Sequence, residues 1–124
     1  MTRALLITNP FAARAHGNTA TTIRDILQAG GWKVDVQATT GPGDARRIAE
    51  EARTGGFDVF VSHGGFFVHL VCVMLDLPWR QASNGLESWF LLNNCSLSRF
   101  DINKKEVTIC YMNRTDHLPD HLIT

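Results

Sequence analysis

The fold of this chain is decided by residues 57–65, Phe57-Asp58-Val59-Phe60-Val61-Ser62-His63-Gly64-Gly65. An apolar, β-branched and aromatic run leads there into a histidine and two glycines, and the apolar segment 66–75 follows directly. This order predicts a buried strand over 57–62 and a helix over 66–75, joined by a glycine turn. A strand that passes through a turn into a helix is the repeating unit of α/β folds.

The same unit occurs twice before residue 57. The apolar run 4–8 ends at Asn9-Pro10 and predicts a buried strand, which a helix over 19–28 follows. Residues 33–37 alternate strictly between polar and apolar, so we expect a strand near a sheet edge. After a Gly-Pro-Gly turn, Asp44 is placed to cap a second helix that ends before Gly55-Gly56.

The rest of the chain predicts a different unit. Residues 95–102 and 106–112 are rich in β-forming residues and predict a hairpin, whereas 79–92 favours a short helix and a connection. We therefore expect a Rossmann-like α/β fold of three layers, α/β/α. Three parallel strands with right-handed crossovers and the C-terminal β-hairpin should form one mixed sheet.

The pattern also predicts a core. The helix over 66–75 is apolar nearly all round, so it should be the most buried helix and cover a sheet face that the first half leaves open. With that cover, we expect residues 1–124 to form a single domain. The first half contributes apolar residues to the same core: Leu5, Ile7, Ile23, Ile26, Leu27 and Val36.

Composition narrows the classes of function. Of 124 residues, 44% are hydrophobic, and twelve basic residues balance twelve acidic ones without a charged block. Neither nucleic acid nor a membrane surface is therefore an expected partner. Cys72, Cys95 and Cys110 lack metal-ligand spacing and are expected as free thiols that fill the core. Without a signal peptide or a long apolar run, we expect a soluble cytoplasmic protein.

The first half resembles the catalytic domain of diacylglycerol and sphingosine lipid kinases. The matching segments, in order, are Ile7–Pro10, Ala29–Val34, Thr39–Ala45 and Gly56–Asp58. In that family the next strand ends in a Gly-Gly-Asp-Gly-Thr loop that holds nucleotide phosphates. Here the loop reads Ser-His-Gly-Gly-Phe-Phe, so its acid and its hydroxyl are missing, and the lipid-binding β domain of the family is not recognised.

The second half resembles the histidine phosphatase, or phosphoglycerate-mutase-like, family. Ser62–Gly65, Leu92–Arg99 and Asn113–Pro119 follow that family's order. The resemblance gives His63 a phosphate contact, while the family's nucleophilic histidine belongs to an N-terminal Arg-His-Gly motif. The nearest segment here, Arg14-Ala15-His16-Gly17, carries an extra alanine and follows the strand end at Asn9 too late. A lipid-kinase-like segment, 1–60, joined to a histidine-phosphatase-like segment, 61–124, suggests an engineered chimera; the alternative is a degenerate natural protein.

The candidate site lies where the predicted parallel strands end. The carboxyl ends of such strands face one crevice, and a helix N-terminus there attracts anions. The expected phosphate- or sulfate-binding residues are Asn9, Thr40, His63, Gly64 and Gly65. No catalytic residue is assigned, although His63 and His16 are the candidates. No metal or cofactor is expected, because Pro119 interrupts the spacing of His117 and His121.

Three functions follow from this pattern. The leading hypothesis is a domain with no selected catalytic function and a residual phosphate-binding crevice. The enzymatic alternative is a phosphomonoesterase of the histidine phosphatase type that uses His16 and His63. The third is a nucleotide- or phosphate-binding module that uses Asn9, Thr40 and the Gly64-Gly65 turn. A monomer and a homodimer both remain open, since an unpaired hairpin edge favours self-association.

Overall fold

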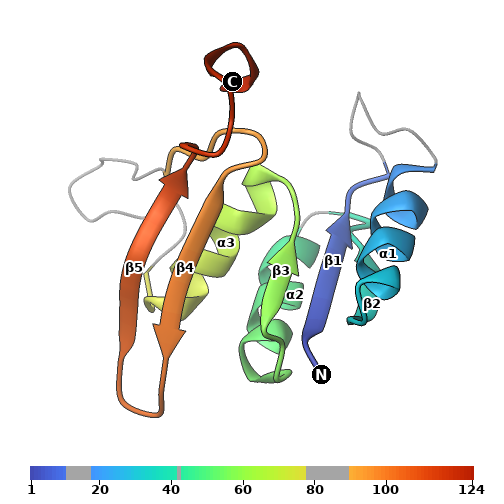
Figure 1. Ribbon diagram of the computed structural model, residues 1–124. Coiled ribbons are helices and arrows are strands. Elements are labelled where there is room, and N and C mark those ends of the chain that lie inside the picture. Colours follow the sequence, from blue (N-terminus) through green and yellow to red (C-terminus); the bar gives the residue numbers. More distant parts are fainter. Residues whose placement is uncertain (11–17, 42, 78–89) are drawn as a thin grey trace.

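The computed structural model describes residues 1–10, 18–41, 43–77 and 90–124. The predicted order of alternating strands and helices followed by a hairpin is confirmed (Figure 1). Helix α3 begins at Gly64 rather than 66, and most of the predicted connection over 79–92 lies outside the described residues. The elements are β1 (Arg3–Thr8), α1 (Thr19–Ala29), β2 (Lys33–Ala38), α2 (Asp44–Thr54), β3 (Val59–Val61), α3 (Gly64–Met74), β4 (Leu97–Ile102), β5 (Val107–Arg114) and a short 3-10 helix, η1 (Asp120–Leu122).

Three parallel strands form the main sheet in the order β2-β1-β3. From β1 the chain first moves outward to β2 and then crosses back over β1 to reach β3. Crossovers of one hand in opposite directions place their helices on opposite faces. Figure 1 shows α1 on one face and α2 and α3 on the other, so the three-layer α/β prediction is confirmed.

The core lies between the sheet and the layer of α2 and α3. Leu5 and Ile7 point into this layer, where they meet Ile48 of α2 and Phe66 and Leu70 of α3. Each of these five side chains is at most 2% exposed. As predicted, α3 is the most buried helix. The sequence predicts that this helix covers a sheet face that the first half leaves open. It lies instead beside α2 on the same face, because the helix that follows β3 continues the layer that α2 begins.

Two predicted core residues are exposed. Ile26 of α1 is 66% exposed and Val36 of β2 is 45% exposed. Helix α1 has no fully buried residue, and β2 is an edge strand. The side of the molecule that α1 and β2 form is therefore open to solvent. The expectation that the cysteines fill the core holds only for Cys72, since Cys95 and Cys110 are exposed. Both lie outside the main sheet, where little packs against them.

The hairpin corrects the prediction of one mixed sheet. Strands β4 and β5 pair with each other and form a separate antiparallel sheet. The reason is local: β3 offers only three residues for pairing, and the hairpin meets the domain through side chains instead. Phe100 packs against Phe67 of α3, with ring centroids 6.4 Å apart, and Met112 also contacts the core.

Arg3 fixes the amino ends of the parallel strands. Its guanidinium donates to the carbonyl of Gly55 at 2.8 Å and to the carboxylate of Asp35 at 3.1 Å, and it lies over the ring of Phe57. Its backbone N–H donates to the carboxylate of Asp58 at 2.8 Å. One residue of β1 thus ties β2 to the segment that enters β3. These contacts fix the positions of the three strands relative to one another, and the strands end at the opposite, carboxyl edge of the sheet.

Candidate crevice at the carboxyl edge of the sheet

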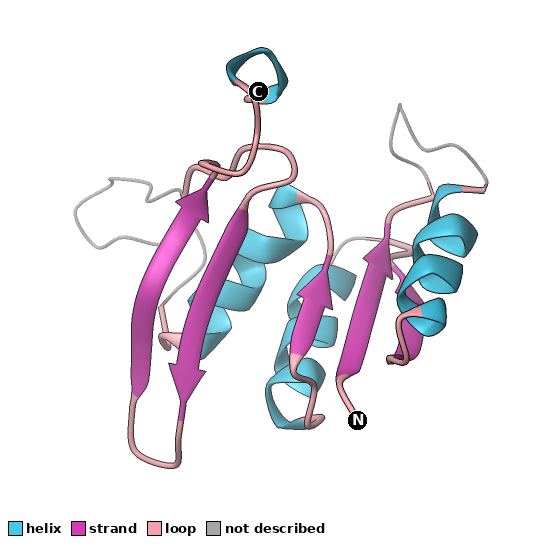
Figure 2. Cartoon of the chain, in the orientation of Figure 1, coloured by secondary structure: helices cyan, strands magenta, loops and turns pink. Residues whose placement is uncertain are grey.

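The carboxyl ends of the three parallel strands carry short polar side chains. Figure 2 shows loops leaving β1 and β3 at this edge. The hydroxyl of Ser62 donates to the carbonyl of Ile7 at 3.4 Å and links the ends of β3 and β1. On the other side of β1, Thr39 donates its N–H at 2.9 Å and its hydroxyl at 3.3 Å to the carbonyl of Thr8. These bonds tie the carboxyl ends of the three parallel strands to one another.

His63 stands at the junction of β3 and α3, as the sequence predicts. It is the residue that precedes the helix, with extended backbone angles of φ −93° and ψ 165°, and its side chain makes no capping hydrogen bond. A Cβ placed on Gly65 would lie 3.6 Å from Nδ1 of His63, so the imidazole lies against the first turn of α3. No acidic residue occupies that turn. The positive end of the helix dipole is therefore not neutralised from within.

The electrostatics of His63 differ from those of a fixed cation. Burial lowers the pKa of His63 below its ordinary value of 6.5, although the residue as a whole is exposed. At neutral pH its imidazole is therefore mainly uncharged and offers one N–H donor. The backbone N–H groups at the start of α3 supply the rest of the positive potential.

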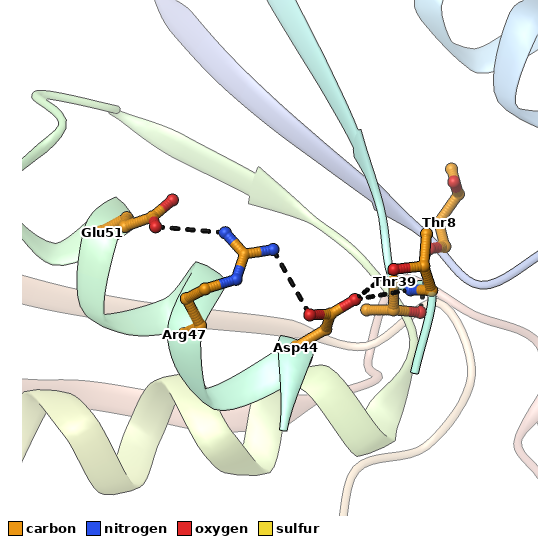
Figure 3. A network of polar contacts seen from close by, with 6 residues as sticks. Thr8, Thr39, Asp44, Arg47 and Glu51 are labelled. Atoms are coloured by element: carbon orange, nitrogen blue, oxygen red, sulfur yellow. Dashed lines mark hydrogen bonds and ion pairs between the residues drawn. The ribbon is translucent and has the colours of Figure 1, made fainter. Parts of the chain in front are cut away.

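Thr40 is already engaged by the protein itself. It donates its backbone N–H at 2.8 Å and its hydroxyl at 2.6 Å to one carboxylate oxygen of Asp44. The other carboxylate oxygen accepts from Arg47 at 3.5 Å, and Arg47 also donates to Glu51 at 3.1 Å (Figure 3). The hydrogen bonds from Thr40, followed by the charge of Arg47, hold the pKa of Asp44 below its usual value.

The structure brings together only part of the predicted set. Asn9 follows β1 at the same edge and is half-buried, and it has polar contacts of its own. His63, Gly64 and Gly65 form the start of α3, whereas the donors of Thr40 point to Asp44. His16 lies outside the described residues.

The C-terminal histidines, His117 and His121, follow β5 and lie outside the parallel sheet. A ring nitrogen of His117 lies 3.0 Å from the carbonyl oxygen of Cys95. In the described part of the chain, no three His, Cys, Asp or Glu residues gather in a way that could hold a metal ion. Over the same residues, no helix has the length and apolar character needed to cross a membrane.

The roles of two residues at the carboxyl edge of the sheet are not predicted by the sequence. The sequence predicts Asp44 as the cap of α2, but Gly43 caps the helix with a φ of +84° and Asp44 is the first helical residue. Its carboxylate then turns back to Thr40 instead of capping its own helix. Ser62 belongs to the Ser-His-Gly-Gly segment, and the sequence does not predict its bond to β1. A serine at a strand end is the only signal that the sequence carries for it.

Comparison with known families gives one match. The diacylglycerol kinase catalytic domain matches residues 3–66, from β1 to the first turn of α3. This range contains the parallel sheet, α1, α2 and the residues at the carboxyl edge of the sheet. No curated protein matches the chain.

Proposed function

The chain belongs to the diacylglycerol kinase catalytic domain family, and we propose that it binds phosphate-bearing ligands at the carboxyl edge of its sheet without transferring the phosphoryl group. The observation that carries this proposal is that the family match ends in the strand–turn–helix segment at the point where the sheet order reverses. In open α/β sheets, ligands bind outside the carboxyl ends of the strands at this reversal. Here the order reverses between β1 and β3.

Binding is expected from the start of α3. The N–H groups of Gly64 and Gly65 lie in its first turn, no acid competes for them, and His63 precedes them. Such helix-end electrostatics typically contribute about 0.3–1 kcal/mol each at an exposed position. A few of these contributions support a dissociation constant in the millimolar range or weaker.

Turnover is not expected, because the catalytic groups are incomplete. The loop that holds nucleotide phosphates in related lipid kinases has here lost its acid and its hydroxyl. His63 has no partner among the described residues that would activate a nucleophile. The histidine-phosphatase-like character of residues 61–124, and an engineered origin without selected catalysis, stay predictions.

The test combines binding with turnover. Wild type should bind inorganic phosphate in a calorimetric or NMR titration, and His63→Ala should weaken this binding by about two- to fivefold. Neither protein should hydrolyse a chromogenic phosphate ester or phosphorylate diacylglycerol above background.

Two outcomes would show that the protein is an enzyme. Hydrolysis above background that disappears in both His16→Ala and His63→Ala would establish a phosphomonoesterase. Phosphorylation of diacylglycerol by wild type would establish a kinase. Either result would overturn the proposal of binding without turnover.

A further inference from the structure

A cavity of about 780 Å³ opens at the end of the molecule opposite the carboxyl edge of the sheet. It lies between the last turns of α2 and α3 and the turn that joins β4 to β5 (Figure 1). Three segments far apart in the sequence line it, residues 53–54, 74–76 and 102–107. This volume is typical of pockets that enclose a small organic molecule.

Part of this lining is apolar. Met74 and Leu75 come from the end of α3, and Ile102 and Val107 form the last pair of the hairpin before its turn; these four residues are the apolar wall of the cavity. Ile102 lies two residues beyond Phe100 and therefore on the same face of the hairpin. Phe100 packs against the core, whereas Ile102 is 58% exposed. The inner face of the hairpin thus continues past the core and carries an exposed apolar side chain at the cavity.

Three cations line the same cavity: Arg53, Lys104 and Lys105. Within the residues that the structure describes, none of the three forms an ion pair. The other arginines of α2 differ, because Arg46 and Arg47 are paired with glutamates on the same helix. The positive charges at the cavity are therefore not neutralised by direct contacts.

Asn103 holds the turn that carries the two lysines. Its Oδ1 accepts from the N–H groups of Lys105, at 2.8 Å, and Glu106, at 3.1 Å. Its Nδ2 donates to the carboxylate of Glu106 at 3.2 Å, and its backbone N–H donates to the carbonyl of Glu106 at 3.0 Å. The carboxylate of Glu106 is thus engaged within the turn, and the ammonium groups beside it are left for a ligand.

The balance of charge decides which anion fits. Three cations less two acids, Asp76 and Glu106, leave the lining with a net charge of +1. The C-terminal ends of α2 and α3 also direct partial negative charge toward the cavity. A small hydrated anion gains little from so weak a potential. An anion that also covers the apolar wall gains from the burial of apolar surface as well.

We propose that this cavity binds a small amphipathic anion, such as an alkyl or aryl carboxylate or sulfate. The apolar body lies against the apolar wall, and the anionic group lies beside Lys104 and Lys105. This is a second site, separate from the carboxyl edge of the sheet, so the inference goes beyond the proposed function. The occupant is a free small molecule and not a membrane surface, because the cations and the apolar residues line a cavity between three segments.

The experiment uses three probes on the full chain and follows backbone amide shifts. Hexyl sulfate carries both the apolar body and the charge, inorganic sulfate carries only the charge, and hexanol carries only the apolar body. We expect hexyl sulfate to shift the amides of Ile102, Lys104 and Lys105 saturably, with a dissociation constant of about 1–10 mM. Hexanol should bind there about three- to tenfold more weakly. Inorganic sulfate should leave these amides unchanged over the same range.

A variant of the apolar wall tests the contact with the apolar body. Ile102→Ser should weaken hexyl sulfate binding by about three- to tenfold, because it removes buried apolar surface from the complex. The matched control is Ile109→Ser, at a residue of the same hairpin that is 44% exposed and does not line the cavity. This control should bind hexyl sulfate as wild type does.

A second variant tests the contact with the anionic group. Lys104→Gln combined with Lys105→Gln should weaken hexyl sulfate binding by about three- to tenfold. The matched control combines Arg24→Gln with Lys33→Gln, which removes the same charge from α1 and β2 and should change nothing. Circular dichroism establishes that each variant is folded.

Several results would overturn the inference. Inorganic sulfate that shifts Lys104 and Lys105 as strongly as hexyl sulfate would show that charge acts alone. Equal weakening in Ile109→Ser would indicate adsorption to the whole hairpin. An absence of hexyl sulfate shifts at the cavity would refute the site, and cosedimentation with vesicles of anionic phospholipid would then assign the turn to a membrane surface. The amides of Gly64 and Gly65 in the same sulfate titration test the proposed function separately.

Discussion

His63 is the residue through which pH should act on anion binding at the carboxyl edge of the sheet. Burial lowers its pKa below 6.5, so the uncharged imidazole prevails at pH 7 and the charged form is populated only in more acidic solution. A bound anion favours the charged form and should therefore raise this pKa.

In the unliganded protein, protonation of His63 lowers the free energy of unfolding. The unfolded chain takes up the proton first, so the contribution of His63 is present above about pH 6.5 and is lost as the pH falls through its folded pKa.

Sulfate is the suitable probe for this pH dependence, because its own charge does not change between pH 8 and pH 5. We expect sulfate binding to strengthen by about two- to fivefold as the pH falls below 6.5. In His63→Gln, which keeps a donor but cannot become charged, the same titration should be flat. A wild-type profile as flat as that of His63→Gln would show that the imidazole does not face the anion.

The residues of the site could be predicted only in part. The start of α3 was predictable, because a β-rich run followed by two glycines and an apolar segment has few alternatives. The engagement of Thr40 was not, since it depends on which residue caps α2. Gly43 adopts a φ of +84°, a conformation that glycine reaches without strain, and this moves Asp44 into the helix. The sequence contains both residues but does not say where the helix begins.

Among the elements, α3 should contribute most to stability. Leu70 is 1% exposed and lies in the core with Leu5 and Ile48. Leu70→Ala should lower the free energy of unfolding by about 2–5 kcal/mol, because the truncation leaves a cavity among fixed neighbours.

The matched control is Ile26→Ala on α1, where the side chain is 66% exposed. This change should cost less than about 1 kcal/mol. Urea denaturation of both variants measures the difference. A loss for Leu70→Ala no larger than that for Ile26→Ala would mean that the core lies elsewhere.

The hairpin shows why the strands could be predicted from the sequence, whereas their arrangement into sheets could not. Two β-rich runs around Asn103-Lys104-Lys105 predict the hairpin, and β4 and β5 confirm it. Whether it would join the main sheet depended on the length of β3 and on the packing of Phe67 against Phe100. Neither is contained in a local pattern, because both arise from contacts between segments about thirty residues apart or more. The exposure of Ile26 likewise follows from how α1 lies on the sheet.

For the whole molecule, the core joins the two halves of the chain. Leu5, Ile7 and Ile48 from the first half pack with Phe66 and Leu70 from the second. A fragment of residues 1–56 would expose the face of the sheet that α3 covers, so we expect it to show no cooperative thermal transition. The full chain should melt in a single step, which calorimetry or circular dichroism can follow. A sigmoidal transition in the fragment would show that the first half folds alone.

The central claim is that an anion binds at the carboxyl edge of the sheet, at the start of α3. A sulfate titration followed by amide chemical shifts tests it most directly, because it reports the place of binding together with its strength. We predict saturable shifts of the Gly64 and Gly65 amides in the millimolar range, with Lys104 and Lys105 in the hairpin turn at the opposite end of the molecule unaffected. Shifts at Lys104 and Lys105 with none at Gly64 and Gly65 would contradict the account.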